Sequence, residues 1–406
     1  MSNPIGFRRR EQLFNQTMRT MLRTAEHLRA TSDCVGLYVT TVCVAYAPAG
    51  TPAGVTVTRE TFLTRIELTI GAEHVLWAKE NLVNLAIGCL LGNFVKYIAW
   101  VDADVEFSEG WVAATLDAID AIAAKGDGAF VQMFERAQLL AADDSVMHMV
   151  PSFGAQYAAG KSYAPRAGTN ADYWHPGFAW AADAGSLRCL ASVMGGAALM
   201  ERTLGGADRH MAMALIGRSA ETVPAGMGTD YAGMVVRWAH AAAAARIRLG
   251  VAKGVTLRHF WHGSLERRRY VERWDILQGY RFEPHSHTMH ATLQAPFSLG
   301  VLTWAPVAPP GLRAAVRAYF AQRNEDDDDE RGAGALEPLD IMEPRFRPIA
   351  DSPFSSSLSS PPLLPLSPSF RQTDAPSPSP PSPSPLPSPS KDASTLAWVA
   401  SLVGYA

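Results

Sequence analysis

Two aspartates, Asp102 and Asp104, follow the apolar run 96–101 (KYIAWV), which has the length and the residue types of a buried strand. Alternate side chains of an extended segment project to the same side, so both carboxylates can point into one site. Oxygen ligands of this kind suit Mg²⁺ or Mn²⁺. The alternative is a solvated turn with two exposed aspartates. We favour a cation site, because ionised groups beside a core need a compensating charge.

Asp208 is the second acidic candidate. It follows Gly205, Gly206 and Ala207 at the start of the expected helix 208–216. A carboxylate at a helix start can reach an acceptor hydroxyl as a general base. It can also serve only as an N-cap of the helix. We favour the role at the acceptor.

Two histidines in the segment HFWHG, His259 and His262, are the candidates for a further metal ligand. They fall within the expected strand 255–262. Their odd spacing places them on opposite sides of a fully extended segment, so only one of them is expected to face the site. A packing role is the alternative for either residue.

Lys79 lies on the expected helix 73–91, whose other face is apolar. An ammonium group at this place could bind a phosphate of a cofactor. A position on the solvated surface is the alternative. We include Lys79 among the candidate cofactor-binding residues.

The elements that must position these residues alternate along the chain. Apolar periodicity predicts strands at 35–46, 96–101, 129–134 and 255–262 and helices at 73–91, 111–124, 208–216, 231–245 and 266–277. Such alternation predicts an α/β fold with a mixed, mostly parallel sheet flanked by helices. Ligands bind beyond the carboxyl ends of the strands in such sheets, which is where Asp102 and Asp104 stand.

Composition changes at both ends of the chain. Residues 1–30 are polar and helix-prone, and we expect a partly disordered leader. Residues 31–323 form the expected domain. Residues 324–406 begin with an acidic run and continue as a Ser/Pro-rich stretch, which predicts a disordered tail. The aromatic and glycine-rich segment 151–187 is expected to be a binding loop.

Bulk properties exclude several classes of protein. The net charge of −3 over 406 residues argues against a nucleic-acid partner. No segment has the length and apolar character of a signal peptide or of a membrane span, so a cytoplasmic location is expected, with an organelle as the alternative. None of the cysteines has CxxC spacing, and we expect all of them to be packing residues: Cys34, Cys43, Cys89 and Cys189.

Four blocks of the sequence resemble one family. The stretch 75–107, which contains Asp102 and Asp104, resembles the DxD-centred half of glycosyltransferases with the GT-A fold, and most resembles their family-2-like members. The later blocks YWHPGFAWAA, GGADRHMAMALIG and HFWHGSLERRRYVERWDIL resemble the second half of the same group. The resemblance covers roughly 35–284. DxD alone is weakly specific, whereas the four blocks in this order are strongly specific.

The resemblance implies a role for each matching residue. Asp102 and Asp104 match the motif that holds Mn²⁺ or Mg²⁺ and the donor diphosphate. Gly177 matches a loop that closes over donor and acceptor, and Asp208 matches the residue for the acceptor or the general base. His262, or else His259, matches the histidine that completes the metal shell. The resemblance thus implies that Asp102, Asp104 and His262 bind the metal.

The implied reaction is the transfer of a sugar from a nucleoside-diphosphate sugar, expected to be UDP-linked, to a hydroxyl of a glycan, a protein or a small molecule. One departure from the family pattern is the short, Thr-rich segment 48–73, where nucleotide recognition is expected. A degenerate, non-catalytic sugar-nucleotide or glycan-binding module is therefore an alternative. A phosphohydrolase of the haloacid-dehalogenase type is less well supported, because Val105 and Glu106 follow the DxD motif in place of Gly-Thr.

Overall fold

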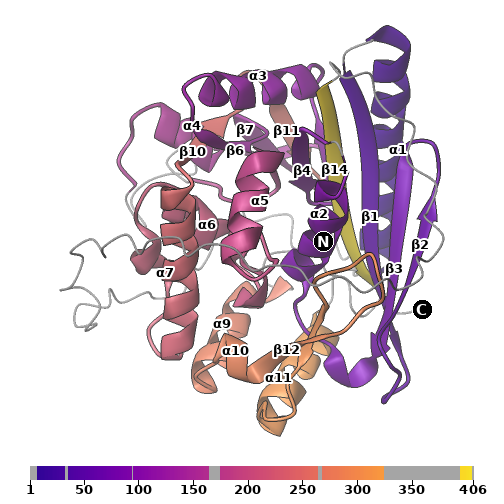
Figure 1. Ribbon diagram of the computed structural model, residues 1–406, viewed down its shortest axis with the longest axis vertical. Coiled ribbons are helices and arrows are strands. Elements are labelled where there is room, and N and C mark those ends of the chain that lie inside the picture. Colours follow the sequence, from indigo (N-terminus) through magenta and orange to yellow (C-terminus); the bar gives the residue numbers. More distant parts are fainter. Residues whose placement is uncertain are drawn as a thin grey trace, which may run out of the picture.

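The computed structural model describes residues 7–32, 35–93, 95–163, 174–263, 268–323 and 394–404. These residues form an α/β fold in which helices cover both faces of a central sheet (Figure 1). Within the described residues, no helix is both long enough and apolar enough to cross a membrane.

The central sheet has eight strands. From one edge to the other they are β10 (Ile247–Val251), β6 (Gly128–Gln132), β9 (Ala179–Asp183), β4 (Tyr97–Val101), β14 (Ser394–Gly404), β1 (Val35–Ala47), β3 (Leu63–Gly71) and β2 (Gly54–Arg59). The run β4, β14, β1, β3 is parallel throughout, and β10 is parallel to β6. Strand β9 is antiparallel to both of its neighbours, and β2 is antiparallel to β3. The predicted α/β class and the mixed sheet are confirmed.

The other described strands form two smaller sheets. One has the order β5 (Val105–Phe107), β11 (Thr256–His259), β7 (Arg136–Leu140) and β8 (Val146–Pro151), and the other pairs β12 (Thr288–Ala291) with β13 (Val301–Trp304). The smaller four-stranded sheet matters for the site, because β5 continues the chain from β4 and pairs with β11.

Helices lie on the two faces of the central sheet. On one face lie α1 (Arg8–Thr31) and α3 (Trp111–Ala123). On the other lie α2 (Lys79–Leu91), α5 (Ala184–Val193), α6 (Ala207–Leu215), α7 (Thr229–Ala244), α9 (Tyr270–Gly279) and α11 (Pro310–Gln322). Short helical segments are η1 (Ala72–His74), α4 (Phe153–Ala158), η3 (Glu201–Thr203), η4 (Ser219–Thr222) and α10 (Pro284–His287).

Strand β4 is buried on both faces, as a strand between two helix layers must be. Its side chains alternate: Ile98 and Trp100 belong to the core under α2, whereas Tyr97, Ala99 and Val101 belong to the core under α1 and α3. The carboxyl end of this rigid strand carries the Asp102–Asp104 turn. The turn is therefore fixed from below by well-packed side chains.

The expectation of a loose leader at 1–30 is wrong over the described part. Residues 8–31 form helix α1, which buries Leu13, Phe14, Met18 and Met21 against the sheet. The sequence shows a polar segment, because the other face of this helix carries its charged residues. The apolar stripe is narrow, but it is enough to dock the helix.

The predicted tail 324–406 also needs correction in one part. Residues 394–404 form β14, which lies between β1 and β4 and is parallel to both (Figure 1). Residues 324–393 lie outside the described residues. The apolar composition of residues 394–404 suits a strand with neighbours on both sides.

Candidate functional site

The turn Asp102–Asp104 connects β4 to β5 and is held on two sides by backbone hydrogen bonds. The Asp102 N–H donates to the Phe178 carbonyl at 2.7 Å, and the Asp104 carbonyl accepts from the Phe260 N–H at 2.9 Å. The first bond ties the turn to the start of β9. The second ties it to the end of β11, which brings the histidine segment beside the aspartates.

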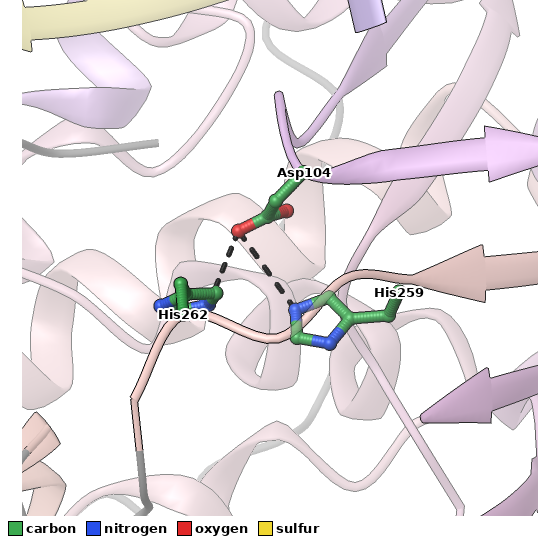
Figure 2. Close-up of side chains that lie close together, drawn as sticks. All are labelled: Asp104, His259 and His262. Carbon is green, nitrogen blue, oxygen red and sulfur yellow. Dashed lines mark ion pairs between the residues drawn. The ribbon is translucent and has the colours of Figure 1, made fainter. Parts of the chain in front are cut away.

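Asp104 meets two histidines from the end of β11. Its Oδ2 lies 3.2 Å from His262 Nε2 and 3.8 Å from His259 Nε2. Figure 2 shows both imidazole rings directed at this one carboxylate oxygen. One potential ligand atom from each of these three residues lies within 4.8 Å of the others, so they form a possible metal-binding group.

The group is almost sealed from solvent. The side chains of Asp104, His259 and His262 are 6%, 10% and 2% exposed. Burial lowers the pKa of His259 well below its usual range, so its imidazole is neutral and has a lone pair that can bind a metal ion. Burial alone would raise the pKa of Asp104, but His259, His262 and the charge of Arg10 hold it well below its usual range.

The carboxylate has one oxygen with no hydrogen-bond partner. Asp104 Oδ1 is buried and accepts no hydrogen bond from any described residue. A buried carboxylate oxygen without a donor is costly, and a cation would satisfy it. A set of one carboxylate and two imidazoles suits transition metals, Mn²⁺ and Zn²⁺ among them, better than it suits Mg²⁺.

Asp102 belongs to a second, adjoining group. Lys79 Nζ lies 3.2 Å from Asp102 Oδ1 and 3.1 Å from Asp208 Oδ2. The side chains of Lys79, Asp102 and Asp208 are 18%, 24% and 20% exposed, so solvent reaches this group more easily than the histidine group. Buried Glu80 lies next to them, with Oε1 3.8 Å from the ammonium.

The charges in this second group affect one another. Burial alone would lower the pKa of Lys79, but Asp102, Asp208 and Glu80 raise it well above its usual range. Lys79 is therefore a permanent cation. Burial raises the pKa of Asp208 although Lys79 opposes the shift, so this carboxylate is a stronger base than one in water.

Asp208 does not cap its helix. Helix α6 begins at Ala207, its N-cap is Gly206, and no side chain caps it. Gly206 has φ +80°, and a Cβ there would lie 2.7 Å from the Trp274 ring, so the position requires glycine. The N-cap interpretation of Asp208 is wrong, and its carboxylate instead turns to Lys79.

The segment 175–178 links the two groups. The rings of His175 and Phe178 stack at 3.8 Å, and Phe178 stacks on His259 at 4.5 Å. Phe178 has φ +76°, a strained conformation for this residue, which is typical of functional sites. Burial lowers the pKa of His175 to about 3, so its ring is neutral. Gln132 fixes the segment by donating to the carbonyls of His175 and Gly177.

Gly177 lies beside Asp208. A Cβ at Gly177 would be 3.7 Å from Asp208 Oδ2 and 3.3 Å from His175 Cε1. The predicted binding loop 151–187 is more structured than expected, with α4 and β9 inside it. Its residues 164–173 lie outside the described residues.

The structure thus brings together all the candidate site residues but divides them differently. The predicted metal set was Asp102, Asp104 and His262. The structure groups Asp104 and His262 with His259, and places Asp102 with Lys79 and Asp208.

The expectation that only one of the two histidines faces the site is wrong, because β11 ends at His259. The odd-spacing rule holds only for extended backbone. Sequence reasoning also missed the roles of Gln132 and Phe178, for which the types and spacing of the residues gave no signal.

Comparisons with models of protein families, with curated proteins and with solved structures find no match to this chain. The resemblance to GT-A glycosyltransferases rests on the sequence blocks and stays a prediction.

Proposed function

We propose that this protein is a metal-dependent glycosyltransferase, which moves a sugar from a nucleoside-diphosphate sugar to an acceptor hydroxyl. The observation that carries the proposal is the pairing of two different groups across a single turn. Asp104 belongs to a buried group suited to a cation, and Asp102 belongs to a more open group that contains Lys79 and Asp208. A diphosphate and a hydroxyl need such neighbouring but different surroundings.

The residues fit a metal ion. Asp104, His259 and His262 would hold it, and the partnerless Asp104 Oδ1 would be satisfied by it. When bound there, a divalent cation would supply the positive charge that stabilises a leaving diphosphate. The two imidazoles favour Mn²⁺ over Mg²⁺ as this cation.

Lys79 and Asp208 divide the remaining tasks. Lys79 is a fixed positive charge at the open edge of the site and can bind a phosphate oxygen of the donor. Asp208, with its raised pKa, can take the proton of the acceptor hydroxyl as the new bond to the sugar forms and the bond to the diphosphate breaks. Gly177 lies beside Asp208, and His175 lies beside Gly177.

The test is a transfer assay with a panel of UDP- and GDP-sugars, with Mn²⁺ and with chelator. We expect turnover only with the metal. Asp208→Asn is expected to lower kcat by about 100-fold or more, the usual worth of a general base. Asp117→Asn, on the exposed side of α3, is the matched control. Full activity of both Asp104→Asn and Asp208→Asn would refute the proposal.

The histidine pair supports one other function. One carboxylate and two imidazoles also form the ligand set of zinc hydrolases. Release of free sugar from the donor with Zn²⁺, without transfer to any acceptor, would favour hydrolysis. Binding of a sugar nucleotide without either reaction would favour a binding module.

A further inference from the structure

Helix α1 contacts the turn that carries Asp104. The hydroxyl of Thr17 lies 3.1 Å from the carbonyl oxygen of Ala103 and 3.1 Å from that of Val105, the two residues that flank Asp104. Thr17 is 1% exposed. A buried hydroxyl shared between these two carbonyls fixes the backbone on both sides of the metal-binding carboxylate.

The same helix also contacts the histidine segment. Arg9 Nε donates to the Trp261 carbonyl at 3.1 Å, and Trp261 directly precedes His262. The next residue of the helix, Arg10, is also buried, at 5% exposed. One helix is thus bonded to both chain segments that supply the metal-binding group.

Packing strengthens this arrangement. Leu13 and Phe14, between the two contacts, belong to the same core as Ala103 and Val105. The two ligand segments are themselves joined by the bond from Phe260 N–H to the Asp104 carbonyl. Helix α1 therefore lies across a joint between segments far apart in the sequence.

We propose that α1 is a positioning element of the metal centre, so that docking of α1 and binding of the cation stabilise each other. Thr17 and Arg9 are the positioning residues, and neither is itself a ligand. The proposal rests on the metal centre of the proposed function and does not depend on sugar transfer. Contacts that orient metal ligands typically change affinity by 10- to 100-fold when they are removed.

The coupling must act in both directions. A helix that holds Asp104 and His262 at the right separation lowers the cost of ordering the ligands when a cation binds. By linkage, a bound cation must then hold the helix more tightly by the same factor. A cover that only shields the site from water would show no such coupling.

The first experiment measures the affinity for Mn²⁺ alone by calorimetry. Thr17→Val, which keeps the shape but removes the hydroxyl, is expected to weaken binding about 10-fold. Thr17→Ser is expected to restore it. Thr24→Val is the matched control, because among the described residues the Thr24 hydroxyl bonds only to the Thr20 carbonyl of its own helix. Equal affinity in wild type and Thr17→Val would overturn the proposal, whether or not the protein transfers sugars.

The second experiment uses no variant of α1, so its result does not depend on whether such a variant folds. Hydrogen exchange of the α1 amides is measured with and without Mn²⁺. We expect Mn²⁺ to slow this exchange about 10-fold in wild type and to have no effect in His262→Ala. If Mn²⁺ binds but does not change the hydrogen exchange of the α1 amides, this proposal is overturned, whereas the proposed function is not. Lack of Mn²⁺ binding by the wild type would overturn both.

Discussion

Lys79 Nζ lies 3.1 Å from Asp208 Oδ2, although Lys79 stands at the start of α2 and Asp208 in the first turn of α6. The same ammonium contacts Asp102 Oδ1. One cation therefore serves two carboxylates that would otherwise repel each other. The position of Lys79 lowers the raised pKa of Asp208 and orients both carboxylates.

Replacing Lys79 by methionine removes this cation and leaves two poorly solvated carboxylates. We expect Lys79→Met to lower the free energy of unfolding by about 3 kcal/mol at pH 8, the usual result of breaking a buried ion pair. The pKa of Asp208, already raised in the folded state, should rise further. A raised acid pKa destabilises the fold above the unfolded pKa, so the loss should shrink at pH 5.

Denaturant unfolding at the two pH values measures this effect. Lys96→Met is the matched control, because Lys96 pairs with Asp120 at 3.6 Å on the exposed surface and should change stability little. A Lys79→Met protein as stable as wild type at pH 8 would show that Asp102 and Asp208 are solvated without Lys79.

Binding of metal should separate the two aspartates of the motif. Mn²⁺ at about 100 times its Kd is expected to stabilise the wild type by roughly 2.7 kcal/mol and raise its melting temperature. Asp104→Asn, His259→Ala and His262→Ala should lose this shift, whereas Asp102→Asn should keep most of it. The thermal shift with Mn²⁺ measures the difference.

Mg²⁺ should raise the melting temperature less than Mn²⁺ does, because imidazole is a poor ligand for Mg²⁺. The exposed His240 provides the control variant His240→Ala. Loss of the Mn²⁺ shift in Asp102→Asn but not in His259→Ala would return Asp102 to the metal set.

A buried histidine away from the site should make the protein sensitive to acid. His210 contacts the hydroxyls of Thr222 and Tyr231 at 2.6 and 2.8 Å, and burial lowers its pKa to about 3. Between that value and 6.5 the unfolded chain binds a proton that the folded chain rejects. Stability should therefore fall with pH below 6.5 by roughly 1 kcal/mol per pH unit from this residue alone.

Urea unfolding from pH 7 to pH 4 tests this prediction. His210→Gln is expected to show a shallower loss of stability with acid than wild type, even if it is less stable at pH 7. His240→Gln, on the exposed side of α7, should keep the wild-type slope. An unchanged slope in His210→Gln would assign the acid sensitivity to other buried groups.

Removal of the segment that forms β14 should divide the central sheet. Strand β14 is the only described strand between β1 and β4, so a chain ending at residue 393 loses the pairing of each with β14, while β1 keeps β3 and β4 keeps β9. We expect loss of cooperative unfolding, and rapid hydrogen exchange in β1 and β4. A peptide of residues 394–404 should slow that exchange again, and a scrambled peptide should not. Wild-type exchange in the truncated chain would contradict the role of β14.

The sequence was most informative where local pattern and burial agree. Strand β4 and helix α3 lie within one residue of their predicted bounds. A short apolar run predicts a buried strand and a regular apolar stripe predicts a helix, and both patterns are visible in the local sequence alone. The DxD turn at the end of β4 follows from the same pattern.

Features that depend on distant segments could not be predicted in this way. Strand β14 packs between β1 and β4, which lie far from it along the chain, and helix α1 packs on β5 as well as on the adjacent β1. The grouping of His259 with His262 depends on where β11 ends, and the shared contact of Lys79 depends on how α2 and α6 face each other. Periodicity carries no information on either point.

The position of β14 has a consequence for how the chain reaches this fold. The DxD strand β4 ends at Val101, but its parallel neighbour β14 begins at Ser394. During synthesis, β4 therefore has no partner on this edge until residues 394–404 have been made. During that time β1 and β4 have open edges, which other chains can occupy. Such long-range pairing slows folding and favours aggregation or strand exchange between copies. A chaperone that shields these edges is therefore expected to raise the yield of folded protein.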